Sequence, residues 1–173
     1  MRHKLIILCG LLMVMVGGAW RYHQVNSQIP QHPVEERFFQ KGRWVAGRTA
    51  RFKVQRVKQQ VHADMVAVSV HLLIEQKQAA HYGFKAGNYN LVENTWLNVP
   101  YMISNPASSM RHPSGKIFTD REMATEGIKD AWLSFTVPKT SYEQRSQPVR
   151  FSFLAPEQPH QFIKYSLFLP PVA

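Results

Sequence analysis

Hydrophobic and polar residues alternate along most of the chain beyond residue 38, with the two-residue period of a half-buried β-strand. The longest run covers residues 65–75, where five aliphatic side chains share one parity and no proline interrupts them. They are Val66, Val68, Val70, Leu72 and Ile74. Because β-branched residues favour extended backbone, this run predicts a strand in the centre of a sheet.

Shorter alternating runs on both sides of this strand predict further strands. They cover residues 50–55, 97–103, 131–137, 149–153 and 163–169. Pro100 indicates an edge position or a bulge in the second of these runs. Turn-forming residues gather between the runs, at 83–90, 104–115 and 157–160. Residues 119–127 predict a helix of about one or two turns, and the whole pattern predicts an all-β antiparallel β-sandwich.

The first 22 residues have the features of an export segment. A basic start is followed by residues 5–20, which carry no charge. As a helix these 16 residues are about 24 Å long, slightly shorter than a bilayer core of about 30 Å. We expect a signal anchor over residues 1–22 that crosses the cell membrane once and leaves the C-terminal part of the chain outside. Cleavage near Ala19, which would release a secreted protein, is the alternative.

The next segment, residues 23–37, is polar and follows neither the strand period nor the helix period. It contains Pro30 and Pro33, which disfavour regular structure. We therefore expect a tether at 23–37 that leads to one β-sandwich domain over residues 38–173.

Charge and cysteine content narrow the possible functions. The 173-residue chain has 21 Lys and Arg against 11 Asp and Glu, a formal net charge of +10. Such an excess predicts an anionic neighbour, either acidic lipid, a wall polymer or nucleic acid, unless it only keeps a membrane-proximal domain soluble. The one cysteine, Cys9, lies in the apolar N-terminal segment, which excludes disulfide bonds and cysteine chemistry from the domain.

The basic residues are concentrated between residues 41 and 58, where there are seven of them and no acid. The candidate contacts to an anionic surface are Arg43, Arg48, Arg51, Lys53, Arg56 and Lys58. On a strand, Arg51 and Lys53 share the outward face, opposite Phe52 and Val54. The alternative is a charged strand edge that prevents pairing with other chains.

The remaining polar residues form no recognisable catalytic or metal-binding pattern. We therefore predict no catalytic, cofactor-binding or metal-binding residues and no cofactor. His71 lies on the polar face of the run at 65–75, so we expect a hydrogen-bonded surface histidine. Asp120 and Glu122 are candidates for a hydrolase of envelope polymers only if a cleft holds them about 5–9 Å apart.

Single-stranded nucleic acid is the weaker candidate for the anionic partner. Trp44 beside Arg43 and Arg48 combines a stacking surface with charge, as such binding requires. Export removes the usual ligand, however, and most aromatic residues have the buried parity. We expect no nucleic acid partner.

Residues 43–169 resemble the telokin-like, immunoglobulin-fold accessory domains found on exported proteins of Gram-positive bacteria. The resemblance rests on a basic-apolar strand leading into the long aliphatic strand, an aromatic segment at 95–104, and a last hairpin at 149–169. Most of it lies in the stretch Trp132-Leu-Ser-Phe-Thr-Val-Pro138. The chain departs from the common form because it has no lipid-attachment cysteine and its loop at 104–115 lacks the usual acidic and glycine residues.

This resemblance implies an immunoglobulin-like sandwich that acts as an extracytoplasmic interaction module and has no enzyme activity to transfer. We therefore predict a non-enzymatic, membrane-tethered module that binds a protein partner or an anionic envelope polymer. The alternatives are a small subunit of an envelope machine, or an envelope-polymer hydrolase that uses Asp120 or Glu122.

Overall fold

The computed structural model of the protein describes residues 2–27, 34–77, 91–99, 105–143, 148–158 and 161–171. The chain divides into two compact units, Met1–Pro33 and Val34–Ala173. The first contains α1 (Arg2–Ser27), along which apolar side chains such as Leu11 and Val14 are exposed. Within the described ranges, no helix combines the length and the apolar character that spanning a membrane requires.

The N-terminal boundaries in the structure differ from those expected from the sequence. Helix α1 continues to Ser27, beyond residue 22, and β1 (Glu35–Phe38) lies mostly within the expected tether at 23–37. The sequence does not reveal β1 because all four of its residues are exposed, so apolar and polar residues do not alternate there. The second unit therefore begins before residue 38.

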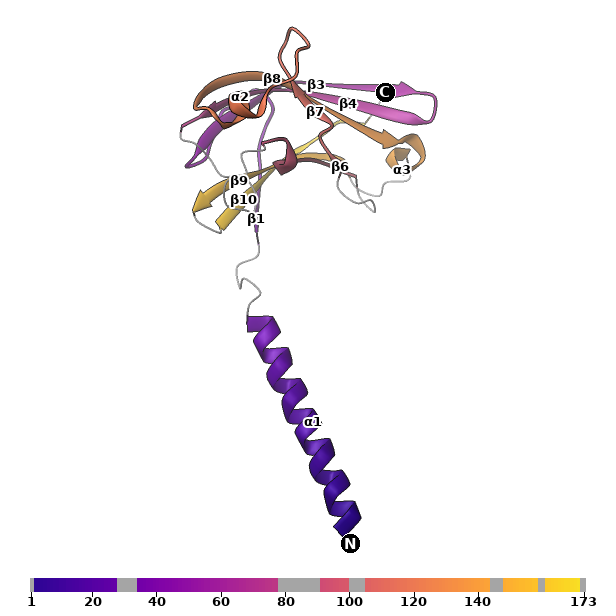
Figure 1. Cartoon of the computed structure of the whole chain (residues 1–173). Coiled ribbons are helices and arrows are strands. Elements are labelled where there is room, and N and C mark those ends of the chain that lie inside the picture. The colour runs from indigo at the N-terminus through magenta and orange to yellow at the C-terminus, as the bar shows by residue number, and fades with distance from the viewer. Residues whose placement is uncertain are drawn as a thin grey trace. The chain divides into compact units, whose positions relative to one another are not determined.

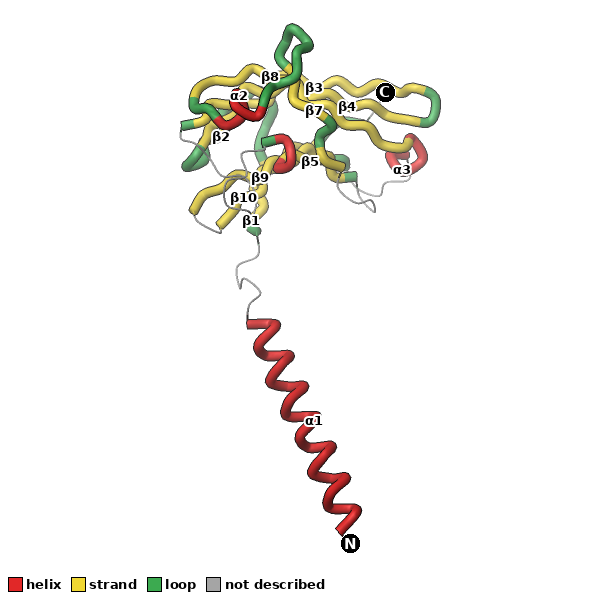
Figure 2. The backbone as a smooth tube through the Cα atoms, viewed as in Figure 1, coloured by secondary structure: helices red, strands yellow, loops and turns green. Residues whose placement is uncertain are grey.

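In the residues that the structure describes, the second unit is a β-sandwich of two five-stranded sheets, which Figures 1 and 2 show as two layers. The first, which we call the β4 sheet, contains in spatial order β2 (Val45–Ala46), β3 (Ala50–His62), β4 (Met65–Gln76), β8 (Gly127–Pro138) and β7 (Ser109–Arg111). The second, the β9 sheet, contains β1, β10 (Gln161–Phe168), β9 (Arg150–Gln158), β5 (Thr95–Asn98) and β6 (Asn105–Pro106).

The core lies between the sheets and is formed by one parity of each long strand. β4 pairs with β3 on one side and β8 on the other, and its five predicted aliphatic residues are at most 1% exposed. The prediction of a central strand is confirmed. Aromatic rings join the layers: Phe52 of β3 packs edge-on against Phe153 of β9, with ring centroids 5.1 Å apart.

The expectation of purely antiparallel pairing is wrong at one edge. β1 pairs with β10 in parallel, with Glu35 opposite Ile163 and Phe38 opposite Ser166. A hairpin turn forces antiparallel pairing, whereas parallel strands need a long connection. Because nearly the whole domain separates β1 from β10 in sequence, no turn dictates their relative direction.

Some predicted features lie outside the described residues, and others are confirmed or extended. The turn at 83–90 and the end of the run at 97–103 are outside. The expected short helix is α2 (Asp120–Ala124), and two further short helices are η1 (Val92–Asn94) and α3 (Lys139–Glu143).

Candidate functional site

A β-bulge in β3 decides which side chains the β4 sheet presents to solvent. Val54 lies opposite Leu72 and Arg56 lies opposite His71, the next residue of β4, so Gln55 is an extra residue without a partner position. Before the bulge, odd-numbered residues of β3 face outward. Beyond it, even-numbered residues do, because paired residues point to the same side of a sheet.

The bulge brings four basic side chains into one line on the outer face of the β4 sheet. We call this line the basic row; it consists of Arg51, Lys53, Arg56 and Lys58. Their partner positions on β4 are Glu75, Leu73, His71 and Ser69, which follow one another at every second residue. Since a strand advances about 3.4 Å per residue, the row has a regular spacing of about 7 Å and spans about 20 Å.

Two tryptophans flank the basic row and contact it through their rings. The Arg51 guanidinium and the Lys53 ammonium lie 4.9 and 5.2 Å from the ring centroid of Trp44. The Lys58 ammonium lies 5.1 Å from the ring centroid of Trp132, a residue of β8. Such contacts contribute about 0.5–1 kcal/mol each at exposed sites, so the rings help to hold the cations along the face.

Acidic residues compensate only part of this charge. Arg51 forms an ion pair with Glu75 across the sheet. Asp130 of β8 contacts His71 Nε2 at 2.5 Å instead of a member of the row. Among the described residues, Arg56 forms neither an ion pair nor a hydrogen bond, and no acid pairs with the two lysines. The row therefore presents about three uncompensated positive charges.

Of the six basic residues predicted to contact an anionic surface, the structure brings four together. Arg43 lies in the turn before β2, next to Trp44. Arg48 lies in the turn between β2 and β3, where its backbone N–H donates to the Glu157 carboxylate at 3.3 Å. Both are therefore outside the basic row.

The sequence also carries a signal for the bulge. The apolar parity of β3 changes from even numbers, ending at Val54, to odd numbers, beginning at the partly buried Val57. Such a change of parity within one strand indicates an inserted residue. The sequence carries no comparable signal for the contact of Trp132 with Lys58. This contact depends on the pairing of β4 with both β3 and β8.

The basic row also borders a strand edge. β2 pairs with β3 only at Phe52 and Arg51, and the Gly42 N–H donates to the Val54 carbonyl at 2.8 Å. In the part of the chain that the structure describes, no strand pairs with the outer side of β3 beyond Val54. Charged residues and bulges at such edges prevent pairing with other chains. The alternative interpretation of the basic segment thus has geometric support.

His71 is a hydrogen-bonded histidine on the outer face, as predicted. Besides its contact to Asp130, its ring stacks on Trp132, with centroids 4.6 Å apart and an interplanar angle of 6°. The described residues contain no cluster of three or more side chains able to hold a metal ion.

Asp120 and Glu122, the two candidate carboxylates of a hydrolase, lie in the first turn of helix α2. Glu122 closes a capping box at the start of α2: it accepts from the Thr119 N–H at 2.7 Å, and its own N–H donates to the Thr119 hydroxyl. These hydrogen bonds from Thr119 backbone and side chain lower the pKa of the Glu122 carboxyl. Asp120 is exposed in the same turn. This arrangement is that of a helix N-terminus.

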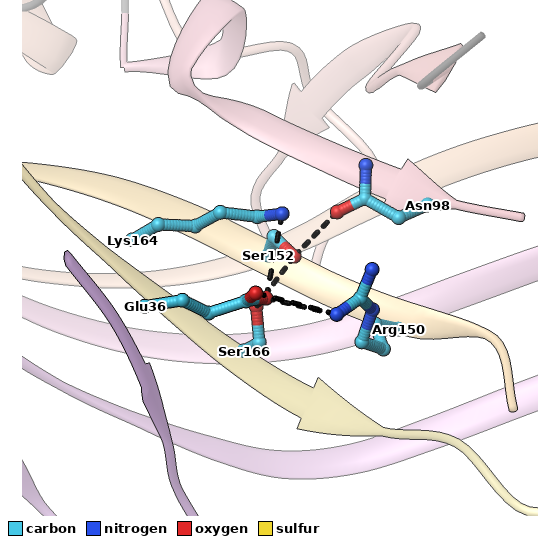
Figure 3. Close-up of polar contacts among 6 residues, drawn as sticks. All are labelled: Glu36, Asn98, Arg150, Ser152, Lys164 and Ser166. Carbon is cyan, nitrogen blue, oxygen red and sulfur yellow. Dashed lines mark hydrogen bonds and ion pairs between the residues drawn. The ribbon is translucent and has the colours of Figure 1, made fainter. Parts of the chain in front are cut away.

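A second polar cluster lies on the β9 sheet around Glu36 of β1 (Figure 3). The Glu36 carboxylate accepts hydrogen bonds from the Ser166 hydroxyl at 2.6 Å and from Arg150 Nη1 at 3.2 Å, and lies 3.4 Å from Lys164 Nζ. Burial raises the pKa of Glu36, but the Ser166 hydrogen bond and the charges of Lys164 and Arg150 outweigh it, so the pKa is lowered.

This cluster extends across the β9 sheet, from β10 to β9 and β5, through a second hydroxyl. Ser166 Oγ lies 2.9 Å from Ser152 Oγ, and the Ser152 hydroxyl donates to Asn98 Oδ1 at 2.6 Å. Both serines are fully buried, at 0% exposure, so no substrate reaches their oxygens. The contacts join β1, β10, β9 and β5. We therefore interpret this set of residues, which we call the Glu36 cluster, as a hydrogen-bond and ion-pair network that holds β1 in the sheet.

Comparison with known proteins supports the β-sandwich fold. No protein-family model matches the chain, and no curated protein matches it. An uncharacterized β-sandwich protein from Clostridium difficile 630 has a similar solved structure, with a TM-score of 0.54 and 10% sequence identity. The similarity covers 83% of this chain and 100% of that chain. At this identity it shows the fold alone.

Deletion of Gln55 tests the bulge. Because Gln55 has no partner position, its deletion joins Val54 directly to Arg56; these two residues stay opposite Leu72 and His71, so Arg56 and Lys58 still face outward. We expect the free energy of unfolding, measured by urea denaturation, to change by no more than about 1 kcal/mol. The matched change Gln55→Ala keeps the bulge and should alter it by no more than about 0.5 kcal/mol. A loss of about 3 kcal/mol or more on deletion alone would show that Gln55 is a paired residue whose removal turns Arg56 and Lys58 toward the core, and would contradict the register.

Glu36→Gln tests how much the Glu36 cluster stabilises the domain and how this stabilisation depends on pH. Because the pKa of Glu36 is lowered in the folded state, its stabilisation is present above the ordinary pKa of about 4.3 and is lost as the pH falls through the folded value. We expect the variant to be about 1 kcal/mol less stable at pH 7, and the difference to be smaller at pH 3, below the ordinary pKa of a glutamate. Denaturation at both pH values measures this.

The neighbouring change Glu35→Gln serves as the control, since Glu35 is exposed and its ion-pair partner among the described residues is Arg37 in its own strand. It should have a smaller effect at pH 7. A difference for Glu36→Gln that persists unchanged at low pH would show that its carboxylate charge does not stabilise β1.

Proposed function

We propose that the protein is a non-enzymatic, extracytoplasmic β-sandwich module that binds an anionic envelope polymer through the basic row. The observation that carries the proposal is the bulge at Gln55, which aligns four cations on one face although they are unevenly spaced in the sequence. About three of them lack an acidic partner, so the face has a net positive charge that attracts a polyanion. No acidic side chain of the described residues competes for these cations once the polyanion is bound.

Two features favour binding over catalysis. The carboxylate of Glu122 is engaged in the capping box of α2, and the hydroxyls of Ser152 and Ser166 are buried. The basic row, in contrast, is a line of side chains on a sheet surface and is suited to contacts along a chain. Contacts of this kind hold a polymer without changing its bonds.

A protein partner is the second candidate, and a specific observation favours it. The unpaired side of β3 beyond Val54 offers backbone N–H and C=O groups to which an extended peptide can add as a further strand. A small subunit of an envelope machine would use this edge. Such a partner would bury the strand edge, whereas a polymer on the basic row would contact only its side chains.

The immunoglobulin-like assignment is also a proposal, and the order of strands supports it. β3, β4, β8 and β7 are adjacent in the order of strands A, B, E and D of an immunoglobulin domain. In the other sheet, β5, β9 and β10 have the order of strands C, F and G. This order is compatible with the resemblance to telokin-like domains of Gram-positive exported proteins.

Export through the N-terminal segment is the remaining part of the proposal. Its support is the basic start, the uncharged residues 5–20 and the small residues before Trp20. The helix can act as a signal anchor at the cell membrane or be removed by cleavage near Ala19, and both routes place the domain outside.

Binding to linear polyanions tests the proposed function. We expect the full-length protein in detergent to bind poly(glycerol phosphate), polyglutamate or both, with the affinity falling steeply between about 50 and 200 mM salt. Charge reversal by Lys53→Glu with Arg56→Glu should weaken binding about 30-fold, because each cation near an anionic surface contributes about 1 kcal/mol. Isothermal titration calorimetry measures the affinities.

The control is Lys116→Glu with Lys139→Glu, which changes the net charge equally outside the basic row, at the exposed Lys116 and at the half-buried Lys139, whose ammonium pairs with Glu143. It should retain most of the affinity. Equal losses in both double variants would mean that net charge alone attracts the polymer, and absence of binding in the wild type would exclude this function.

Cell fractionation with intact-mass measurement tests export. We expect the domain of the expressed chain to be degraded by protease added outside spheroplasts, either with an intact N-terminus in membranes or beginning near Trp20 after cleavage. The substitution Val14→Asp, in the middle of the apolar segment, should leave the domain protected inside. Protection of the wild-type domain would contradict an extracytoplasmic location.

A further inference from the structure

The spacing of the basic row restricts the kind of polymer that fits it. The partner positions of the four cations are consecutive same-face residues of β4, so the bulge keeps the interval between Lys53 and Arg56 equal to the others. The row is thus a ladder of four positive charges at about 7 Å intervals. A linear ligand whose negative charges repeat at the same interval engages all four cations without bending.

The repeat of such a ligand follows from bond geometry. An extended polypeptide advances about 3.3–3.6 Å over three backbone bonds, or about 1.2 Å per bond. An interval of about 7 Å therefore corresponds to about six backbone bonds per charge. Polyphosphate has two bonds per charge and polyglutamate three, so about two-thirds of the charges of polyphosphate and about half of those of polyglutamate would fall between the cations. A chain of three-carbon units joined by phosphodiesters has six: P–O, O–C, C–C, C–C, C–O and O–P.

Nucleic acid has the same six-bond repeat, and the aromatic side chains distinguish the two. Binding of single strands gains affinity from bases that stack on free aromatic faces. Here Arg51 and Lys53 lie against the Trp44 ring, which is 43% exposed, and Lys58 and His71 lie against the half-buried Trp132 ring. The tryptophans thus serve to position the protein's own cations, which suits a phosphodiester chain without bases.

We infer that the basic row binds a linear polymer of three-carbon polyol units joined by phosphodiesters, one phosphate to each cation, lying along β3. This inference rests on the proposed function and specifies its ligand. The strand edge beside the row leaves room for the chain, since no described strand pairs with β3 there beyond Val54.

A length series of glycerol phosphate oligomers with one to eight units tests the inference on the full-length protein. The affinity should rise by a constant factor per unit up to four units and then only slowly. With four phosphates engaged, a plot of log affinity against log salt should have a slope of about −3. Polyphosphate and polyglutamate of equal total charge should bind at least about tenfold more weakly.

One variant changes the length dependence itself. Lys58→Gln removes the last cation of the row, so the rise in affinity should stop at three units instead of four. The matched control Lys116→Gln also removes one exposed charge and should leave the limit at four. Loss of a single charge elsewhere cannot reproduce this shift.

The outcomes separate the inference from the proposed function. If all polyanions of equal charge bind equally, or the limit stays at four units in Lys58→Gln, the spacing inference is overturned while polyanion binding stands. If none of them binds, both fail. If single-stranded DNA of equal charge binds as tightly as the glycerol phosphate oligomer, the preference for a chain without bases is overturned.

Discussion

Alternation of side chains along extended backbone governs this domain, both where it is maintained and where it is interrupted. In β4 the alternation is unbroken over twelve residues, so one face supplies the centre of the core and the other the middle of the outer surface. In β3 a single extra residue, Gln55, reverses it. The core remains filled because apolar residues change parity at the same point, and the basic residues change with them.

The same interruption has two physical consequences that reinforce each other. A bulge at the border of a sheet discourages pairing with other chains, and so do the lysine and arginine side chains beside it. The bulge also aligns these side chains into a regular row, which is the basis of the proposed polymer binding. Protection of the strand edge and binding along it therefore use the same residues. The two tryptophans stabilise the row through contacts between cations and rings.

The sequence was sufficient for the long strands and insufficient for the short ones. Five of the strands, β3, β4, β8, β9 and β10, contain all but at most one residue of the alternating runs that predicted them, because burial of one face imposes a two-residue period. The edge strands β1, β2, β6 and β7 have two to four residues, too few to show a period, and distant partners position them. For the candidate site, the sequence indicated the basic residues and the outward direction of Arg51 and Lys53. It did not place Arg56 and Lys58 beside them, because that depends on the register with β4.

The basic row and the proposed polymer binding both depend on the direction in which the side chains of β3 point before and after Gln55. Thiol labelling measures this direction. In a Cys9→Ser background, single cysteines would be introduced by Lys53→Cys, Arg56→Cys and Val57→Cys, and their reaction with a charged thiol reagent followed under native conditions. The structure predicts similar, fast labelling at positions 53 and 56 and labelling several-fold slower at 57. Slow labelling at 56 with fast labelling at 57 would show that the alternation continues through Gln55 and that the basic row does not exist.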